Sequence, residues 1–419
     1  NPHSFPVDTL VQMNINNVSL LDDDGNPVPC QSVRGYQTNG DDTRNTVFPV
    51  SLPGFGYATY YIYKDRESAG QQASLSASQN HLENDCLRVE FDPASGGISR
   101  FYDKKAGTEL AGGVLSRALV IDDEPSDTWA HKIFTFDRVV GAFECTDITL
   151  LENGPLRACV RVTSRFGDST LVQKYSLCAG SRELKVTCSL DFHEKHKIVK
   201  LSFPLASKDC RAVYSMPYGF IEKACTGTEE PGQEWAALID KDTGRGLAVV
   251  NDCKYSFSAE GNELRMIAAR SAIYADHFGQ HSRDDRVEFL DQGELEFTYS
   301  LLPHNQNKPS ATVRSAALLN QPPHVIFETH HEGALPTRMG GIEISADNVI
   351  CKALKMAEDG TGFIARFFEC AGIPTAANVR LSLLNCEFSL ELNPQEIKTM
   401  WISPDGTECR EVAITEWEL

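Results

Sequence analysis

The chain of 419 residues is 41% hydrophobic and 23% charged, the composition of an ordinary soluble globular protein with several domains. Its formal net charge of -19 at pH 7 repels phosphate backbones, which argues against nucleic acid as a partner. No apolar run approaches the roughly 20 residues that cross a bilayer, so we expect no membrane insertion.

Thirteen cysteines are spread along the chain, and the closest two, Cys178 and Cys188, are ten residues apart. The absence of a CxxC pair excludes zinc ribbons and thioredoxin-type chemistry. Reduced thiols in a cytoplasmic protein are the simplest interpretation, and a disulfide or two is left open. The chain begins Asn1-Pro2 without a methionine or signal peptide, so we expect a processed protein or a fragment of a longer one.

Residues 1–75 are predicted to form a small N-terminal β domain. Short apolar runs alternate there with turn sequences such as DDDGNP at 22–27, and no long helical period appears. The segment 67–80 is rich in Ser, Ala and Gln, which makes it the best candidate for a linker.

Residues 76–318 are predicted to form a large antiparallel β-sandwich. Three of their segments, 87–93, 184–192 and 293–302, alternate apolar and polar residues with a period of two. Such alternation indicates antiparallel strands with one buried and one solvated face. Glycine-rich turns recur between the segments, which is typical of a sandwich with few helices.

A proline-rich break, LNQPPH at 319–324, begins the third region. Alternating runs then return, so residues 319–419 are predicted to form a smaller C-terminal β-sandwich of ordinary domain size. The fold class expected for the whole chain is therefore all-β.

Polar and aromatic residues are densest in the stretch 246–277. Two apolar runs, with a turn at 260–262 before the second, each end in such residues. These are Asn251 and Asp252 after the first run, and Arg270, Tyr274, Asp276 and His277 after the second. The pattern favours a β-hairpin with a decorated rim, and the edge of a sugar-binding or reaction cleft remains the alternative.

Two histidine clusters lack the spacing of metal ligands. HEKH at 193–196 continues a strand-like run in which its histidines face opposite sides, and adjacent histidines at 330–331 diverge. The acidic stretch 122–131 surrounds Trp129, whose ring could stack on a pyranose while Asp127 accepts from sugar hydroxyls. A loop pinned by a packed tryptophan explains the same residues, so the residues alone predict a polar rim and no chemistry.

Several segments, taken together and in order, resemble a known family. They are the segments 48–62, 82–110, 123–131, 193–204, 216–223, 234–257, 270–277, 295–304 and 352–372. In this order they resemble the C-terminal β portion of glycoside hydrolase family 38, the α-mannosidases, in its bacterial branch. The resemblance implies a large sandwich of the galactose-mutarotase type, a supersandwich, flanked by smaller β-sandwich domains.

The resemblance also implies an activity that this chain does not hold alone. Members of the family are retaining α-mannosidases in which an N-terminal α/β barrel carries the aspartate nucleophile and a pair of zinc ligands. A following helical segment supplies another zinc histidine, and neither the barrel nor the helical segment is recognised here. We therefore expect no catalytic residue and no metal ligand in this chain. Its expected partners are an α-mannoside carbohydrate and its own N-terminal catalytic barrel, and the chain alone is expected to be inactive.

By the same resemblance, some residues are expected at the rim of the sugar cleft. The stretch RSAIYADH supplies Arg270, Tyr274, Asp276 and His277, and the weaker candidates are Asn251, Asp252, Asp127, Trp129, Tyr218 and Gly219. Packing between domains is the alternative role for the weaker set. No role is carried over to Lys223, because the family often has an arginine there and lysine lacks its bidentate geometry.

Two other classes of function remain open for this chain. A freestanding carbohydrate-binding module would use Trp129 and neighbouring acids on a concave face. An assembly domain would mediate contacts in a homo-oligomer. The sequence predicts neither the mannosidic linkage, nor the aglycone, nor the oligomeric state.

Overall fold

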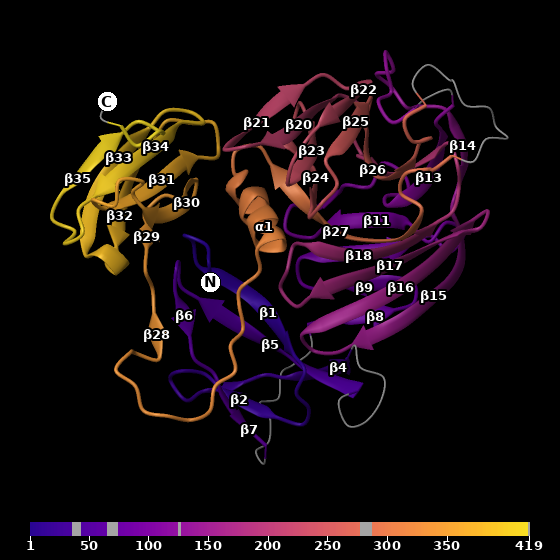
Figure 1. Ribbon diagram of the computed structural model, residues 1–419. Coiled ribbons are helices and arrows are strands. Elements are labelled where there is room, and N and C mark those ends of the chain that lie inside the picture. The colour runs from indigo at the N-terminus through magenta and orange to yellow at the C-terminus, as the bar shows by residue number, and fades with distance from the viewer. Residues whose placement is uncertain (36–42, 65–73, 125–126, 277–286, 418–419) are drawn as a thin grey trace. The chain divides into compact units, whose positions relative to one another are not determined.

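The computed structural model describes residues 1–35, 43–64, 74–124, 127–276 and 287–417 (Figure 1). Strands dominate these residues, and they contain one α-helix, α1 (Ser310–Asn320). The all-β prediction is therefore confirmed. Among the residues described, no helix combines the length and apolarity needed to span a membrane.

The chain divides into two compact units. One comprises residues 73–216 and 221–306, and the other comprises residues 1–72, 217–220 and 307–419. The division into three domains at 75/76 and 318/319 stays a prediction, since the structure groups both terminal regions in one unit.

The larger unit contains a nine-stranded antiparallel sheet with the order β15-β16-β17-β18-β27-β24-β23-β20-β21. Its strands are β15 (Glu144–Asn153), β16 (Arg157–Phe166), β17 (Ser169–Cys178), β18 (Leu184–Phe192), β20 (Cys210–Met216), β21 (Gly219–Lys223), β23 (Trp235–Asp240), β24 (Arg245–Asn251) and β27 (Gly293–Asn305). Alternation along β18 is as predicted: Val186 and Cys188 are buried, while Lys185 and Thr187 are exposed.

A six-stranded sheet has the order β14-β13-β19-β26-β25-β22. Its strands are β13 (Arg117–Asp122), β14 (Val139–Ala142), β19 (Lys197–Pro204), β22 (Thr226–Pro231), β25 (Ser256–Glu260) and β26 (Glu263–Ser271). Val120, Leu201 and Met266 of this sheet belong to the same buried cluster as Val186 of the nine-stranded sheet. The two sheets thus share one apolar core, and each such fully buried side chain stabilises the fold by about 1.5–3 kcal/mol.

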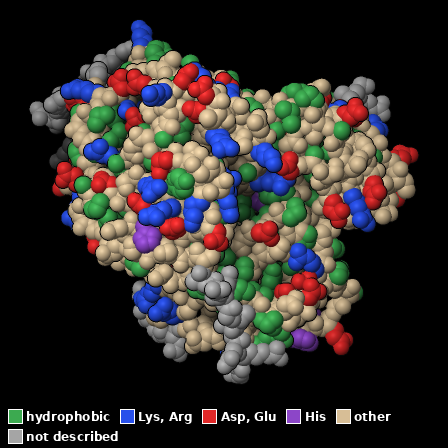
Figure 2. All heavy atoms as spheres, turned by 180° about the vertical axis from the view of Figure 1, so that it is seen from behind, with side chains coloured by type: hydrophobic (Ala, Val, Ile, Leu, Met, Phe, Trp, Pro, Cys, Tyr) green, Lys and Arg blue, Asp and Glu red, His purple; other side chains and the backbone are tan. Residues whose placement is uncertain are grey.

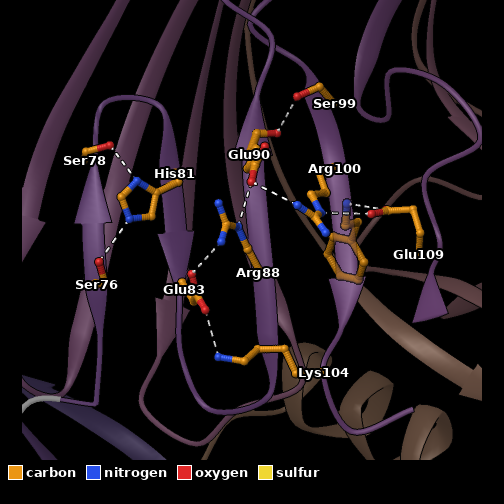
Figure 3. Close-up of polar contacts among 11 residues, drawn as sticks. Ser76, Ser78, His81, Glu83, Arg88, Glu90, Ser99, Arg100, Lys104 and Glu109 are labelled. Carbon is orange, nitrogen blue, oxygen red and sulfur yellow. Dashed lines mark hydrogen bonds and ion pairs between the residues drawn. The ribbon is translucent and has the colours of Figure 1, made fainter. Parts of the chain in front are cut away.

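A five-stranded sheet adds to that core with one face. Its order is β12-β11-β10-β9-β8, and its strands are β8 (Ser76–Ser78), β9 (His81–Glu83), β10 (Leu87–Phe91), β11 (Ile98–Asp103) and β12 (Thr108–Glu109). Its other face carries cross-strand polar contacts (Figure 3). Glu90 accepts from Arg88 at 2.7 Å and from Arg100 at 3.5 Å, and Lys104 pairs with Glu83 at 2.8 Å. Such half-exposed ion pairs contribute little stability, so this face is a solvated surface of the sheet.

The predicted hairpin within 246–277 is wrong in one respect. Its first apolar run is β24 in the nine-stranded sheet, and its second is β26 in the six-stranded sheet. The turn at 260–262 joins β26 to β25, not to β24. The physical reason is an additional strand, β25, in which Phe257 and Ala259 are buried. Between the two apolar runs the chain therefore crosses from the nine-stranded sheet to the six-stranded sheet.

The smaller unit contains five short sheets and α1. Their orders are β1-β5-β4, β3-β2-β7, β28-β6, β29-β32-β33 and β30-β31-β34-β35. The strands are β1 (Val7–Met13), β2 (Ser19–Leu21), β3 (Pro27–Val28), β4 (Gln31–Arg34), β5 (Arg44–Leu52), β6 (Tyr57–Ala58), β7 (Tyr61–Tyr63), β28 (Arg338–Met339), β29 (Glu343–Ile344), β30 (Val349–Met356), β31 (Phe363–Glu369), β32 (Thr375–Leu381), β33 (Cys386–Leu392), β34 (Ile397–Ile402) and β35 (Cys409–Val412).

The last two of these sheets form the C-terminal β-sandwich, with Phe367 of β31 and Val379 of β32 in one apolar cluster. A buried carboxylate, that of Glu369, organises the loops at one end of this sandwich. It accepts hydrogen bonds from the backbone N–H groups of Ala371 (2.6 Å), Gly372 (2.7 Å), Ile373 (3.2 Å) and Gln395 (3.0 Å), and from the side-chain amide of Asn348 (2.8 Å). Five donors compensate the cost of burying the charge.

On the face of the molecule seen in Figure 2, acidic and basic side chains are interspersed and do not segregate into patches of one sign. All thirteen cysteines carry free thiols.

Candidate functional site

Arg270, near the end of β26, is the centre of the candidate site. Its side chain is 18% exposed, and its guanidinium pairs with the buried carboxylate of Asp123, Nε to Oδ2 at 3.1 Å. A second guanidinium nitrogen, Nη2, donates to Asp123 Oδ1 at 3.3 Å. This two-nitrogen contact uses the planar fork of arginine, which a lysine does not have.

The same guanidinium holds the loop that follows β13. Nη2 donates to the carbonyl oxygen of Asp127 at 2.6 Å, and Nη1 donates to that of Thr128 at 3.2 Å. Asp127 also organises the loop itself, because its Oδ1 accepts from the backbone N–H groups of Trp129 at 3.0 Å and Ala130 at 3.1 Å. Trp129 is 54% exposed.

A second loop, after β26, is attached to the first. Ile273 pairs with Asp127 as an isolated parallel bridge, and Thr128 Oγ1 donates to the carbonyl of Ile273 at 3.2 Å. The backbone N–H of Ala275 donates to Thr128 Oγ1 at 3.1 Å. Tyr274 lies between these two anchors and is 57% exposed. The two loops are therefore hydrogen-bonded to each other, and each presents one exposed aromatic side chain, Trp129 or Tyr274.

One further predicted residue belongs to this region. Asp276 is buried at the end of the second loop. His277 lies outside the described residues.

A buried lysine supports the segment that leads from this loop back to β14. The side chain of Lys200 is 1% exposed, pairs with Glu229, and donates to the carbonyl of Phe136 at 2.8 Å and to Ser258 Oγ at 3.1 Å. Burial lowers the pKa of Lys200, and the neighbouring Glu229 opposes that change. The guanidinium of Arg270 lies 5.1 Å from the centre of the Phe136 ring, so both cations contact the same residue.

Asn251 and Asp252, at the end of β24, form a turn. Asn251 is fully buried, donates from Nδ2 to the carbonyl of Gln233 at 2.9 Å and accepts from the N–H of Lys254 at 2.7 Å. Asp252 Oδ2 accepts from the N–H of Thr298 at 2.9 Å. These contacts shape the strand end, and no contact joins either side chain to the Arg270 cluster among the hydrogen bonds described.

Tyr218 and Gly219 belong to the smaller unit. The Tyr218 ring packs edge-on against Phe368, with ring centres 5.5 Å apart. A β-carbon on Gly219 would approach Gln395 Oε1 to 2.6 Å, so the backbone is tightly packed there. The observed role of both residues is packing within that unit.

Four residues of the cluster were not predicted from the sequence: Asp123, Thr128, Phe136 and Lys200. The first two lie in the acidic stretch 122–131 around Trp129. Lys200 had a usable signal, because it is a lysine within the otherwise apolar run IVKL of β19. Phe136 had none, since it lies in a segment without regular periodicity.

The described residues contain no group of three or more His, Cys, Asp or Glu side chains that could hold a metal ion. The residues at 193–196 form a turn between β18 and β19, where His193 Nε2 lies 2.8 Å from Asp191 Oδ1. The expectation that the zinc ligands lie outside this chain stays a prediction.

The antiparallel sheets and the apolar core they share define the class of the chain as an all-β sandwich protein. Residues 82–278 match the glycosyl hydrolases family 38 C-terminal domain, and residues 348–400 match the glycosyl hydrolases family 38 C-terminal beta sandwich domain. The chain therefore belongs to glycoside hydrolase family 38, as a C-terminal portion, which confirms the resemblance seen in the sequence.

Relatives of known activity cover most of this chain. It is 28% identical to alpha-mannosidase G from Dictyostelium discoideum, over 84% of this chain and 36% of that protein. It is 26% identical to human alpha-mannosidase 2C1, over 80% of this chain and 33% of that protein. The chain thus spans about a third of the length of these relatives.

A solved structure matches the fold. The alpha-mannosidase from Enterococcus faecalis V583 has a TM-score of 0.76 and 14% identity, over 95% of this chain and 54% of that one. At this identity the likeness is one of fold.

Proposed function

We propose that this chain is the β region of an α-mannosidase that hydrolyses terminal α-mannosides with retention. In this proposal the chain packs on a catalytic barrel and shapes the rim of the sugar cleft. The chain is inactive without that barrel, and the protein acts in the cytoplasm. The relatives that cover most of the chain are α-mannosidases, which supports the substrate class.

The observation that carries the proposal is the Arg270 cluster. The Arg270 guanidinium fixes the loop of Trp129, and that loop is hydrogen-bonded in turn to the loop of Tyr274, so both aromatic residues are presented to solvent on attached loops. An exposed aromatic ring can stack on the apolar C–H face of a pyranose, and rigid loops reduce the entropy cost of binding. Arg270 is then a positioning residue, since it orients the loops that would meet the sugar.

Retention requires two carboxyl groups, one that attacks the anomeric carbon and one that protonates the leaving oxygen. We assign neither role to this chain, and we place both, with the zinc ligands, on the partner barrel. What the chain itself supplies in the proposal is orientation of the sugar and exclusion of water at the rim.

Hydrolysis of an aryl α-mannoside by the purified chain tests this proposal. We expect no turnover above background, with zinc added or removed. Zinc-dependent turnover by the 419-residue chain would show that the nucleophile lies within it and would refute the proposed division of labour.

A freestanding carbohydrate-binding module is the second candidate, favoured by the exposure of Trp129. Calorimetry with mannose and mannobiose distinguishes the two. Millimolar or tighter binding by the chain alone that is lost in Trp129→Ala would favour the module. Trp417→Ala is the matched control, because Trp417 is 77% exposed and belongs to the other compact unit.

A further inference from the structure

Two cysteines contact each other across the C-terminal β-sandwich. Cys386 is the first residue of β33 in the three-stranded sheet, and Cys409 is the first residue of β35 in the four-stranded sheet. The two thiols lie close enough for each to influence the ionisation of the other. Both side chains also pack in the same apolar cluster between the two sheets.

Two tight turns bring these thiols together. Asn385, directly before Cys386, has a φ of +51°. Gly406, in the turn before Cys409, has a φ of +72°, and a β-carbon there would lie 1.9 Å from the carbonyl oxygen of Leu384. The two turns are therefore in backbone contact, which fixes the approach of the two cysteines.

We propose that Cys386 and Cys409 form a dithiol site, which small-molecule disulfides of the glutathione type oxidise to an intramolecular disulfide. Cys409 is half-buried while Cys386 is 4% exposed, so Cys409 reacts first. This inference is independent of the proposed function, since it concerns a site in the other compact unit from Arg270.

The reaction is two successive thiol–disulfide exchanges. The Cys409 thiolate attacks one sulfur of oxidised glutathione, which forms a mixed disulfide and releases one glutathione thiolate. The Cys386 thiolate then attacks the Cys409 sulfur, which forms the protein disulfide and releases the second glutathione. Each departing thiolate takes up one proton lost by a cysteine, so two protein thiols are oxidised and one small disulfide is reduced.

The rate should depend steeply on pH. Burial, together with the neighbouring Cys386, raises the pKa of Cys409 to about 12. The attacking thiolate is therefore scarce at neutral pH, and its fraction rises about tenfold per pH unit below that pKa. We expect oxidation to be slow at pH 7 and to accelerate by about that factor for each unit up to pH 9.

Peptide mapping of the full 419-residue chain tests the proposal. The chain is incubated with oxidised and reduced glutathione, alkylated under denaturing conditions and digested with trypsin. Cleavage after Lys398 separates Cys386 in peptide 381–398 from Cys409 in peptide 399–410. A disulfide is then read directly as the linked pair of these peptides.

A matched control pair lies in the larger unit. Cys225 Sγ donates to the carbonyl oxygen of Cys210 at 3.7 Å, so these residues are neighbours in which the Cys225 thiol is directed at a backbone oxygen. We expect the amount of Cys386–Cys409 disulfide to exceed that of Cys210–Cys225 disulfide by at least about tenfold. The reason is that proximity raises the effective concentration of one thiol at the other. Cys409→Ser should abolish the link, and Cys30→Ser should leave it unchanged.

Three results would overturn the proposal. The first is recovery of both peptides as separate alkylated species in the oxidised sample. The second is their recovery as separate glutathione adducts, which would show that the second exchange does not occur. The third is linking at the same rate in chain denatured with urea, which would show that the fold does not bring the thiols together.

Discussion

Replacing Arg270 by alanine should release the loop that carries Trp129. The change removes an ion pair to the buried Asp123 and two hydrogen bonds to loop carbonyls. Loss of one partner of a buried ion pair costs about 3–5 kcal/mol. If about 3 kcal/mol of this stabilises the ordered conformation of the Trp129 loop, the backbone amides of that loop should exchange with solvent deuterium about 100-fold faster in Arg270→Ala than in the unmodified chain. Hydrogen exchange of peptides from 127–137 measures the change.

Arg265→Ala is the matched control for this experiment. Arg265 lies on the same strand with similar exposure, 17%, but it pairs with Glu263 two residues away at 2.6 Å. It should leave exchange in 127–137 unchanged. Equal exchange in Arg270→Ala and the unmodified chain, or equal acceleration in both variants, would refute the role assigned to Arg270.

Three other substitutions test the physical account of the fold. Glu369→Gln turns an amide group toward N–H donors and should destabilise the smaller unit by about 3 kcal/mol in urea unfolding, whereas Glu387→Gln, with a 72% exposed side chain, should cost under about 0.5 kcal/mol. Gly406→Ala, blocked by a carbonyl at 1.9 Å, should cost more than Gly360→Ala, which has a similar φ of +70° and no atom within 4 Å; equal costs would contradict the contact. Burial lowers the pKa of His304 from 6.5 to about 4, so the unfolded chain binds this proton first and stability falls by up to about 3 kcal/mol as pH drops through that range. His304→Phe should remove that part of the pH dependence, and an unchanged profile would contradict it.

Strands were predictable wherever one face is buried and the other is wet. The residues of β18 and β10 alternate in the sequence as they do in the structure, because side chains on a strand point to opposite faces in turn. The crossing between β24 and β25 was not predictable in this way. Periodicity locates a strand but contains no information about which of two sheets will pair with it.

The candidate site was predictable in its residues more than in their roles. Arg270, Trp129 and Tyr274 were recognised by resemblance, and the structure brings the loops that carry them together. Asn251 was expected at a rim and is fully buried, because its amide completes a turn. A polar residue after a strand looks the same in sequence whether it meets a ligand or caps its own backbone.

The order of pairing in the nine-stranded sheet has a consequence for synthesis on the ribosome. β18 ends at Phe192, yet its partner β27 is complete only at Asn305. Chains elongate at about 5–20 residues per second, so one edge of β15–β18 waits roughly 5–25 seconds for the strand that covers it. An uncovered strand edge pairs readily with other chains. During this interval the nascent protein is most exposed to wrong pairing and most in need of a molecular chaperone. Slow elongation between residues 193 and 305 would lengthen the interval.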